Sequence, residues 1–137
     1  MSASPVVRFR IDFSAHAAVG PGKIELLEAI GKSGSLSQAA RDLGMSYRRA
    51  WLLVASLNTS FRKPVARAVT GGRGGGGATL TDFGHALIES YRALDRDISS
   101  IAARHLQGIL PAVARGGRGK NVVSRRAIAA RRISSEN

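Results

Sequence analysis

The chain has 137 residues and a net charge of +12, because 21 lysines and arginines outweigh 9 acidic residues. This length is enough for one domain with a single core and extensions. The charge indicates a polyanionic partner, with nucleic acid favoured over an anionic membrane surface. The sequence has no cysteine, which excludes disulfides and thiolate metal sites.

The N-terminus lacks the apolar core of a secretory signal, and no segment approaches the ~20 apolar residues of a membrane span. We therefore expect a cytoplasmic, nucleoid-associated protein that does not enter the membrane. His16, His85 and His105 are too scattered for a metal site, and no pair of carboxylates stands out. We predict no enzymatic activity and no cofactor.

The first predicted element is a strand over residues 6–13, where apolar and charged residues alternate with a period of two. Its inward positions are Val7, Phe9, Ile11 and Phe13. A single strand needs a partner, so we expect it to pair with a later strand or across a dimer. After the break at Gly20-Pro21-Gly22, a helix is predicted over 23–33 and ends at Gly34.

The stretch from Ser35 to Phe61 has the spacing of a helix-turn-helix. Ser35 and Gln38 stand in the relation of a capping box, which predicts a helix over 36–43. Gly44 suits the turn because it adopts a left-handed conformation without strain. Ser46 is a good N-cap for a second helix over 47–61. Together with helix 23–33, these two helices form a predicted three-helix core.

The second helix of this motif separates into an inward apolar face and an outward face that carries Arg48 and Leu52, with Tyr47, Arg49 and Trp51 on the flanks. The inward residues are Ala50, Leu53, Val54, Leu57 and Phe61. Arginines in a first turn oppose the positive end of the helix dipole. They therefore indicate an external anion, for which DNA phosphate and guanine edges are the obvious candidates. The alternative is an ordinary solvated face.

A β wing is predicted over 65–81, with two strands joined by the glycine-rich segment GGRGGGG. Arg73 lies at the tip, where it could reach a DNA groove or backbone. A GxGxxG pattern is formally present, but a dinucleotide site needs a βαβ context, and the ending of a P-loop is absent. A plain loop without DNA contact remains the alternative.

A long helix over 82–107 follows, and its apolar residues repeat as a heptad seam. The seam consists of Leu87, Tyr91, Leu94, Ile98 and Ile101. At ~1.5 Å per residue this helix is longer than a small winged domain needs, so we expect it to form a homodimer. In the alternative, its first half packs on the domain and its end frays.

Residues 108–137 carry seven basic residues and one acid, which is half of the net charge of +12. We predict a disordered basic tail that adds salt-sensitive, non-specific DNA affinity. A solvated tail without a role is the other interpretation.

Several segments carry a family resemblance that covers roughly residues 6–94: GPGKIELLEAIGKSGSLSQAARDLGMSYRRAWLLVASLN, then P-V, GGRGGGGATLT and F-G. They resemble the N-terminal DNA-binding domain of ModE-type molybdate-responsive regulators and, more distantly, the winged helix of LysR-type regulators. The resemblance implies a dimer that grips two half-sites of a palindromic operator. It places Ser46, Tyr47, Arg48 and Arg49 at the groove-facing start of the recognition helix, and Arg73 at the wing tip.

Full-length members of that family carry C-terminal molybdate-binding domains of the β-barrel kind. Residues 108–137 lack strand alternation and cannot form such a barrel, so we expect this chain not to bind molybdate.

The sequence thus predicts a mainly α fold with a small β wing: a winged helix-turn-helix over 1–81, a dimerisation helix over 82–107 and a tail over 108–137. The predicted function is a sequence-specific transcriptional regulator that binds double-stranded DNA as a dimer. Arg48 and Arg49 would contact bases or phosphates, Leu52 a thymine methyl, and the Ser35 region the backbone. The alternative is a nucleoid-type architectural protein that binds DNA without sequence preference.

Overall fold

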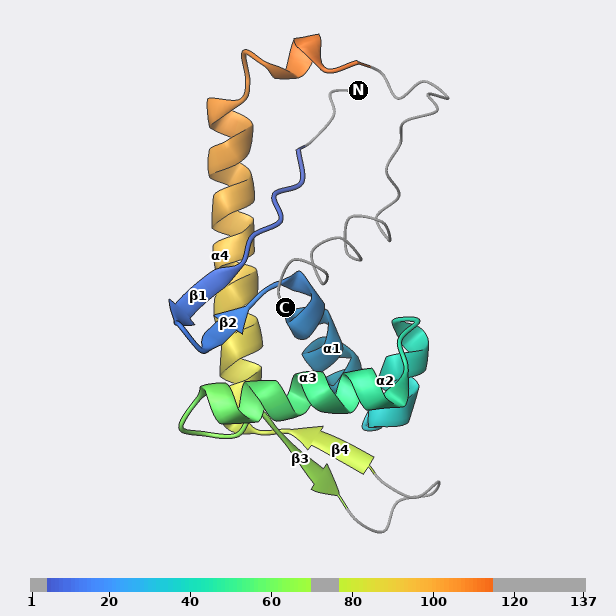
Figure 1. The fold of residues 1–137 in the computed structure, drawn as a ribbon. Helices are drawn as coiled ribbons and strands as arrows, with labels where there is room; N and C mark the ends of the chain where they lie inside the picture. Colours follow the sequence, from blue (N-terminus) through green and yellow to red (C-terminus); the bar gives the residue numbers. More distant parts are fainter. Residues whose placement is uncertain (1–4, 70–76, 115–137) are drawn as a thin grey trace. The chain divides into compact units, whose positions relative to one another are not determined.

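The computed structural model describes residues 5–69 and 77–114. These residues are mainly helical with two small β hairpins, as predicted for a winged helix-turn-helix (Figure 1). In chain order the elements are β1 (Ile11–Ser14), β2 (Ala17–Val19), α1 (Pro21–Ser33), α2 (Leu36–Asp42), α3 (Tyr47–Ser60), β3 (Ala66–Val69), β4 (Gly77–Leu80) and α4 (Asp82–His105).

The prediction of one strand over 6–13 is wrong in its extent. Within that range only the β1 residues are in a strand, and β1 pairs antiparallel with the adjacent β2, which was not predicted. Phe13 was expected to face inward but is 53% exposed. A register shift between Asp12 and Ser14 leaves Phe13 without a partner in the strand pairing, and its ring contacts the edge of the core at Phe61.

The three helices of the predicted core are present. α1 begins two residues earlier than predicted because Pro21 is compatible with a first helical turn. Gly34 and Gly44 have φ values of 68° and 66°, so each provides the left-handed conformation that ends a helix. Helix α1 packs against both α2 and α3.

The core forms two adjoining clusters, one on each side of α1. The first lies under α2 and the start of α3, and its buried members are Leu26, Ile30, Leu36, Ala39, Ala40 and Ala50. The second lies between α3, α4 and the first hairpin, and its buried members are Val19, Ile24, Leu27, Leu57, Val65, Ala66 and Tyr91. Helix α4 is therefore part of the domain core over its first half.

The start of α4 is held tightly against the segment before β3. The Thr81 hydroxyl donates to the Pro64 carbonyl at 2.6 Å and accepts from the Gly84 amide at 3.0 Å. The Thr81 amide donates to the Val65 carbonyl, also at 3.0 Å. A Cβ atom on Gly84 would lie 2.1 Å from the Val65 carbonyl oxygen. Only glycine permits this close approach of helix and loop.

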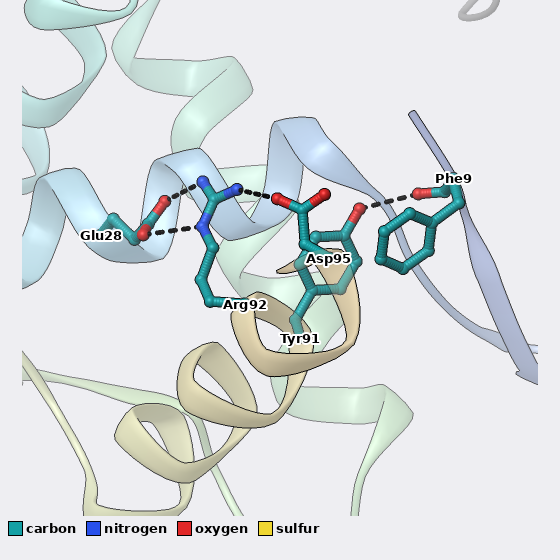
Figure 2. Close-up of polar contacts among 5 residues, drawn as sticks. All are labelled: Phe9, Glu28, Tyr91, Arg92 and Asp95. Atoms are coloured by element: carbon teal, nitrogen blue, oxygen red, sulfur yellow. Dashed lines mark hydrogen bonds and ion pairs between the residues drawn. The ribbon is translucent and has the colours of Figure 1, made fainter. Parts of the chain in front are cut away.

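Two further contacts fasten the middle of α4, and Figure 2 shows both. The Tyr91 hydroxyl donates to the Phe9 carbonyl at 2.7 Å, and the two rings stack with centroids 4.6 Å apart. The Arg92 guanidinium forms a two-pronged ion pair with Glu28 of α1 and a further hydrogen bond with Asp95. These contacts set the direction in which α4 leaves the domain.

The predicted heptad seam consequently divides into two parts. Tyr91 is only 3% exposed, and Leu87 packs on the same core, so both lie within their own chain. Further along, Leu94 and Ile101 are 39% and 45% exposed. Ile98 between them is half-buried.

The described residues from Leu106 onward belong to a second unit, in which Leu110–Ala112 forms one turn of 3-10 helix within the predicted tail. The rest of that tail, residues 115–137, lies outside the described residues. In the described ranges, no helix combines the length and apolarity needed to cross a membrane.

Candidate nucleic-acid interface

The start of α3 carries the predicted DNA-contacting residues. The Ser46 hydroxyl accepts the Arg49 amide at 3.1 Å, which confirms Ser46 as the N-cap. The Arg48 side chain is exposed and that of Arg49 is half-buried. Within residues 5–69 and 77–114, neither arginine has an ion pair, and the first turn of α3 contains no acidic residue. Their charge next to the helix N-terminus is therefore not compensated by a described acidic side chain.

The α2 cap is only half of the predicted capping box. The Ser35 hydroxyl accepts the Gln38 amide at 3.1 Å, as expected. The reciprocal bond is absent because the Gln38 side chain instead bonds Asp42 at 2.7 Å and Arg41 at 2.9 Å. The Ser35 amide donates to the Ser33 hydroxyl. The Ser35 amide at the α2 cap is thus bonded by the preceding turn instead of by Gln38.

The inward and outward faces of α3 differ in burial, as predicted. Ala50 and Leu57 are completely buried against the core. On the remaining surface, Tyr47, Trp51 and Leu52 are 55%, 54% and 50% exposed. Three large, half-exposed apolar side chains lie next to the two arginines, within the first half of one helix. A surface of this kind is typical of a binding site rather than of a simply solvated face.

The predicted wing is a hairpin in which β3 and β4 pair antiparallel from Ala66↔Leu80 to Val69↔Gly77. Strand β4 also forms a bridge with Ser35, and the Ala78 amide donates to the Gly34 carbonyl at 3.1 Å. The hairpin is thereby joined to the corner between α1 and α2. Arg73 at the predicted tip lies outside the described residues.

Asn58 links α3 to the beginning of the wing, a role that was not predicted from the sequence. Its side-chain oxygen accepts the Val65 amide at 2.7 Å and the Ala66 amide at 3.4 Å. Its side-chain nitrogen donates to the Ala66 carbonyl at 3.1 Å. An asparagine in the last turns of a helix, followed by a short loop, was the available signal, since this side chain can bond loop backbone.

Arg67 is a second residue that the sequence pattern did not single out. It lies on β3, opposite Thr79, with an exposed side chain. In the part of the chain that the structure describes, Arg67 has no ion pair. Together with Trp51 and Tyr47 it borders a groove between α3 and the hairpin. The sequence places the positive charge of Arg67 on a strand, but only the fold brings it beside α3.

A three-helix core and a β hairpin joined to that core define a winged helix-turn-helix domain (Figure 1). The three histidines are all exposed: His16 between β1 and β2, and His85 and His105 on α4. In the described residues, no three side chains of the metal-ligating kind gather into one cluster.

Comparison with known proteins agrees with this class. Residues 22–85 match the family model described as bacterial regulatory helix-turn-helix protein, lysR family. Molybdenum-pterin-binding protein MopB of Rhodobacter capsulatus is 42% identical over 85 residues, which cover 62% of this chain and 32% of MopB. Molybdenum transport protein ModE of Azotobacter vinelandii is 36% identical over 99 residues, or 72% of this chain and 37% of that protein. The DNA-binding transcriptional dual regulator ModE of Escherichia coli (strain K12) is 45% identical over 74 residues, which cover 54% of this chain and 28% of that protein.

Residues 22–85 are therefore similar to LysR-type helix-turn-helix domains and to the N-terminal region of ModE regulators. The chain spans about a third of the length of these curated relatives. The relatives are named as regulators and as transport or binding proteins rather than enzymes, in agreement with the prediction of a non-enzymatic protein.

Proposed function

We propose that this chain is a sequence-specific transcriptional regulator that binds double-stranded DNA as a dimer. The observation that carries the proposal is the state of Arg48 and Arg49. Both stand at the capped start of α3, away from the buried Ala50 and Leu57, and have no acidic partner among the described residues. A duplex would supply the missing anionic partner.

In this proposal the start of α3 enters the major groove. Arg48 and Arg49 bond guanine O6 and N7 or adjacent phosphates, since arginine matches both geometrically. Leu52, which is 50% exposed, packs on a thymine methyl. Ser46 and Tyr47 at the helix start, with the Ser35 region at the start of α2, hold the sugar–phosphate backbone. Arg73 anchors the wing tip.

The proposed dimer contact is the second half of α4. Leu94 and Ile101 are one heptad apart, and both are exposed in the single chain. Ile98 lies between them on the same helix. Leu87 and Tyr91, which were predicted to extend the seam, are already used by the core of their own chain. Residues 1–81 would thus bind DNA and 82–107 would pair two copies, while the basic residues in 108–137 add non-specific affinity.

A selection of bound sites from random duplex DNA with the full chain tests the proposal. We expect a palindromic pair of half-sites, which requires two copies of the domain. The variant Arg48→Ala should lose roughly 1–3 kcal/mol of discrimination at one base position if Arg48 reads a base. An equal loss on all sequences would make Arg48 a phosphate contact.

Arg96→Ala is the matched control, because Arg96 is also exposed but lies on α4. Binding without any sequence preference, together with a steep salt dependence, would overturn the proposal in favour of an architectural protein. Because relatives are named for molybdenum transport and for binding a molybdenum pterin, the selection is run with and without molybdate. A difference between the two selections would reveal a response to that anion.

A further inference from the structure

A groove of about 270 Å³ runs between α3 and the β3–β4 hairpin, and we call it the α3–wing groove. On the hairpin side its walls include the small residues Ala66, Ala68, Gly77 and Ala78. Larger side chains at these positions would fill the space, as in an ordinary core. On the α3 side the wall includes Tyr47, Trp51 and Ala55, which are spaced by four residues and therefore share one face of the helix.

Tyr47 and Trp51 leave large apolar surfaces uncovered at this groove. They remain 55% and 54% exposed, although their rings line an apolar hollow. Aromatic side chains contribute most to the free energy of binding when the partner buries them, so a partner that covers Tyr47 and Trp51 would gain substantial binding energy. Both rings also carry one hydrogen-bond donor, the tyrosine O–H and the indole N–H. The occupant should therefore offer an apolar surface with acceptor atoms beside it.

The charge of the groove specifies the occupant further. Arg67 lines it from β3 and has no ion pair within the described ranges. None of the described lining residues is acidic. A second copy of this chain, with its net charge of +12, is a poor match for a cationic groove. A sugar–phosphate chain matches it well, because apolar deoxyribose rings alternate there with anionic phosphates.

We propose that the α3–wing groove seats the sugar–phosphate backbone of one DNA strand. Trp51 and Tyr47 pack on deoxyribose and donate to phosphate oxygens, and Arg67 pairs with a phosphate. This inference rests on the proposed function, and it adds Trp51 and Arg67 as residues that position the domain on DNA. Contacts to the backbone hold the register of α3 without reading sequence.

Trp51 is the only tryptophan of the sequence, so fluorescence excited selectively in tryptophan reports on the groove alone. The full chain is titrated with a duplex that it binds, and quenching by acrylamide is measured for the free and bound protein. We expect the emission to shift and the accessibility of Trp51 to fall when the strand covers it. A Trp51 that stays equally accessible in the complex overturns the inference.

Affinity measurements test the two contact types separately. Trp51→Ala should weaken binding roughly tenfold on every duplex alike, whereas Trp51→Phe should retain most of the affinity because an aromatic ring remains. Arg67→Ala should reduce the slope of log K against log salt by about 1, as expected for one lost phosphate contact. Arg96→Ala on α4 is the matched control and should leave binding largely unchanged.

A single neutral methylphosphonate placed along the duplex locates the phosphate. At one position the methylphosphonate should weaken DNA binding by the wild type but not by Arg67→Ala, because the neutral phosphonate and the substitution remove the same interaction. If Trp51→Ala changed preference at a single base position, the groove would contact bases rather than backbone, and the inference would be wrong. Sequence-specific binding that is unaffected in all these variants would overturn the inference but leave the proposed function intact. A chain that binds no duplex would overturn both.

Discussion

Arg92 on α4 differs from the two arginines at the start of α3 in having acidic partners. On α4, Arg92 pairs with Glu28 of α1 and with Asp95 of its own helix (Figure 2). The bond to Glu28 is the main reason that the pKa of Arg92 is raised above its ordinary value. On α3, Arg48 and Arg49 have no such partner in the described part of the chain. Arg92 is thus compensated within the described residues, whereas Arg48 and Arg49 are not.

The difference separates a structural role from a binding role. At the start and in the first half of α4, polar groups bond other parts of the chain: Thr81 just before the helix bonds Pro64, Tyr91 bonds Phe9 and Arg92 bonds Glu28. The outward side of α3 directs its arginines and aromatic rings to solvent. Substitutions of these α4 contacts should therefore change stability, and substitutions on the outer face of α3 should change DNA binding.

The largest effect is expected for Gly84→Ala. Its Cβ would lie 2.1 Å from the Val65 carbonyl oxygen, so α4 or the loop must move. We expect a loss of about 3 kcal/mol in the free energy of unfolding, measured by urea denaturation of the full chain. Gly22→Ala is the matched control, because a Cβ there meets nothing within 4 Å and alanine favours the helix. If Gly84→Ala were as stable as the wild type, the start of α4 would not be held as described.

A smaller effect is expected for Tyr91→Phe, which keeps the stacked ring and removes the hydrogen bond to Phe9. The loss should be about 1 kcal/mol near pH 8. Burial is the main cause that raises the pKa of Tyr91 above its usual 10, and Asp95 raises it further. A raised pKa in the folded state adds stability below pH 10 that is lost as the pH rises through that pKa.

The advantage of the wild type over Tyr91→Phe should therefore shrink above pH 10. Urea denaturation of both proteins at pH 8 and pH 11 measures this difference. Tyr47 and the lysines are common to both proteins, so their ionisation cancels from the comparison. A difference that does not change with pH would contradict the buried environment of Tyr91.

The smallest effects on stability are expected when an arginine is replaced by methionine on α4 and on α3. Arg92→Met leaves Glu28 and Asp95 without their partner and should cost roughly 1 kcal/mol or less, because the Arg92 side chain is 34% exposed and its ion pairs are partly screened. Arg48→Met should change the free energy of unfolding by no more than about 0.5 kcal/mol, with a small gain from removing a cation at the positive end of α3. Equal losses in the two variants would remove the distinction between the helices.

Much of the fold was predictable because its signals are local. The caps at Ser35 and Ser46, the glycine stops at Gly34 and Gly44 and the heptad run on α4 all act within a few residues of the sequence. Strand β2 was not predictable, since the three apolar residues Ala17–Val19 show no alternation to mark a strand. The half-exposed position of Phe13 coincides with a bulge whose register is set by that missed partner.

The candidate site was predictable only in part, for the same reason. Helical periodicity places Arg48 on the outward face and Arg49 on a flank, and in the structure Arg48 is exposed and Arg49 half-buried. The α3–wing groove requires β3 and β4 to be packed beside α3, which no local pattern specifies. The bond from Tyr91 to Phe9 joins residues 82 positions apart, and that from Arg92 to Glu28 spans 64. Such pairs become visible only when the chain is folded.

The bond from the Ala78 amide to the Gly34 carbonyl couples the hairpin to the α1–α2 corner. Strand β4 cannot swing away from the domain without breaking that bond and the bridge to Ser35. The two surfaces flanking the α3–wing groove consequently belong to one rigid unit, and the hairpin does not move independently of the helices. The rate at which the Ala78 amide exchanges with deuterium therefore measures how often the hairpin separates from the α1–α2 corner.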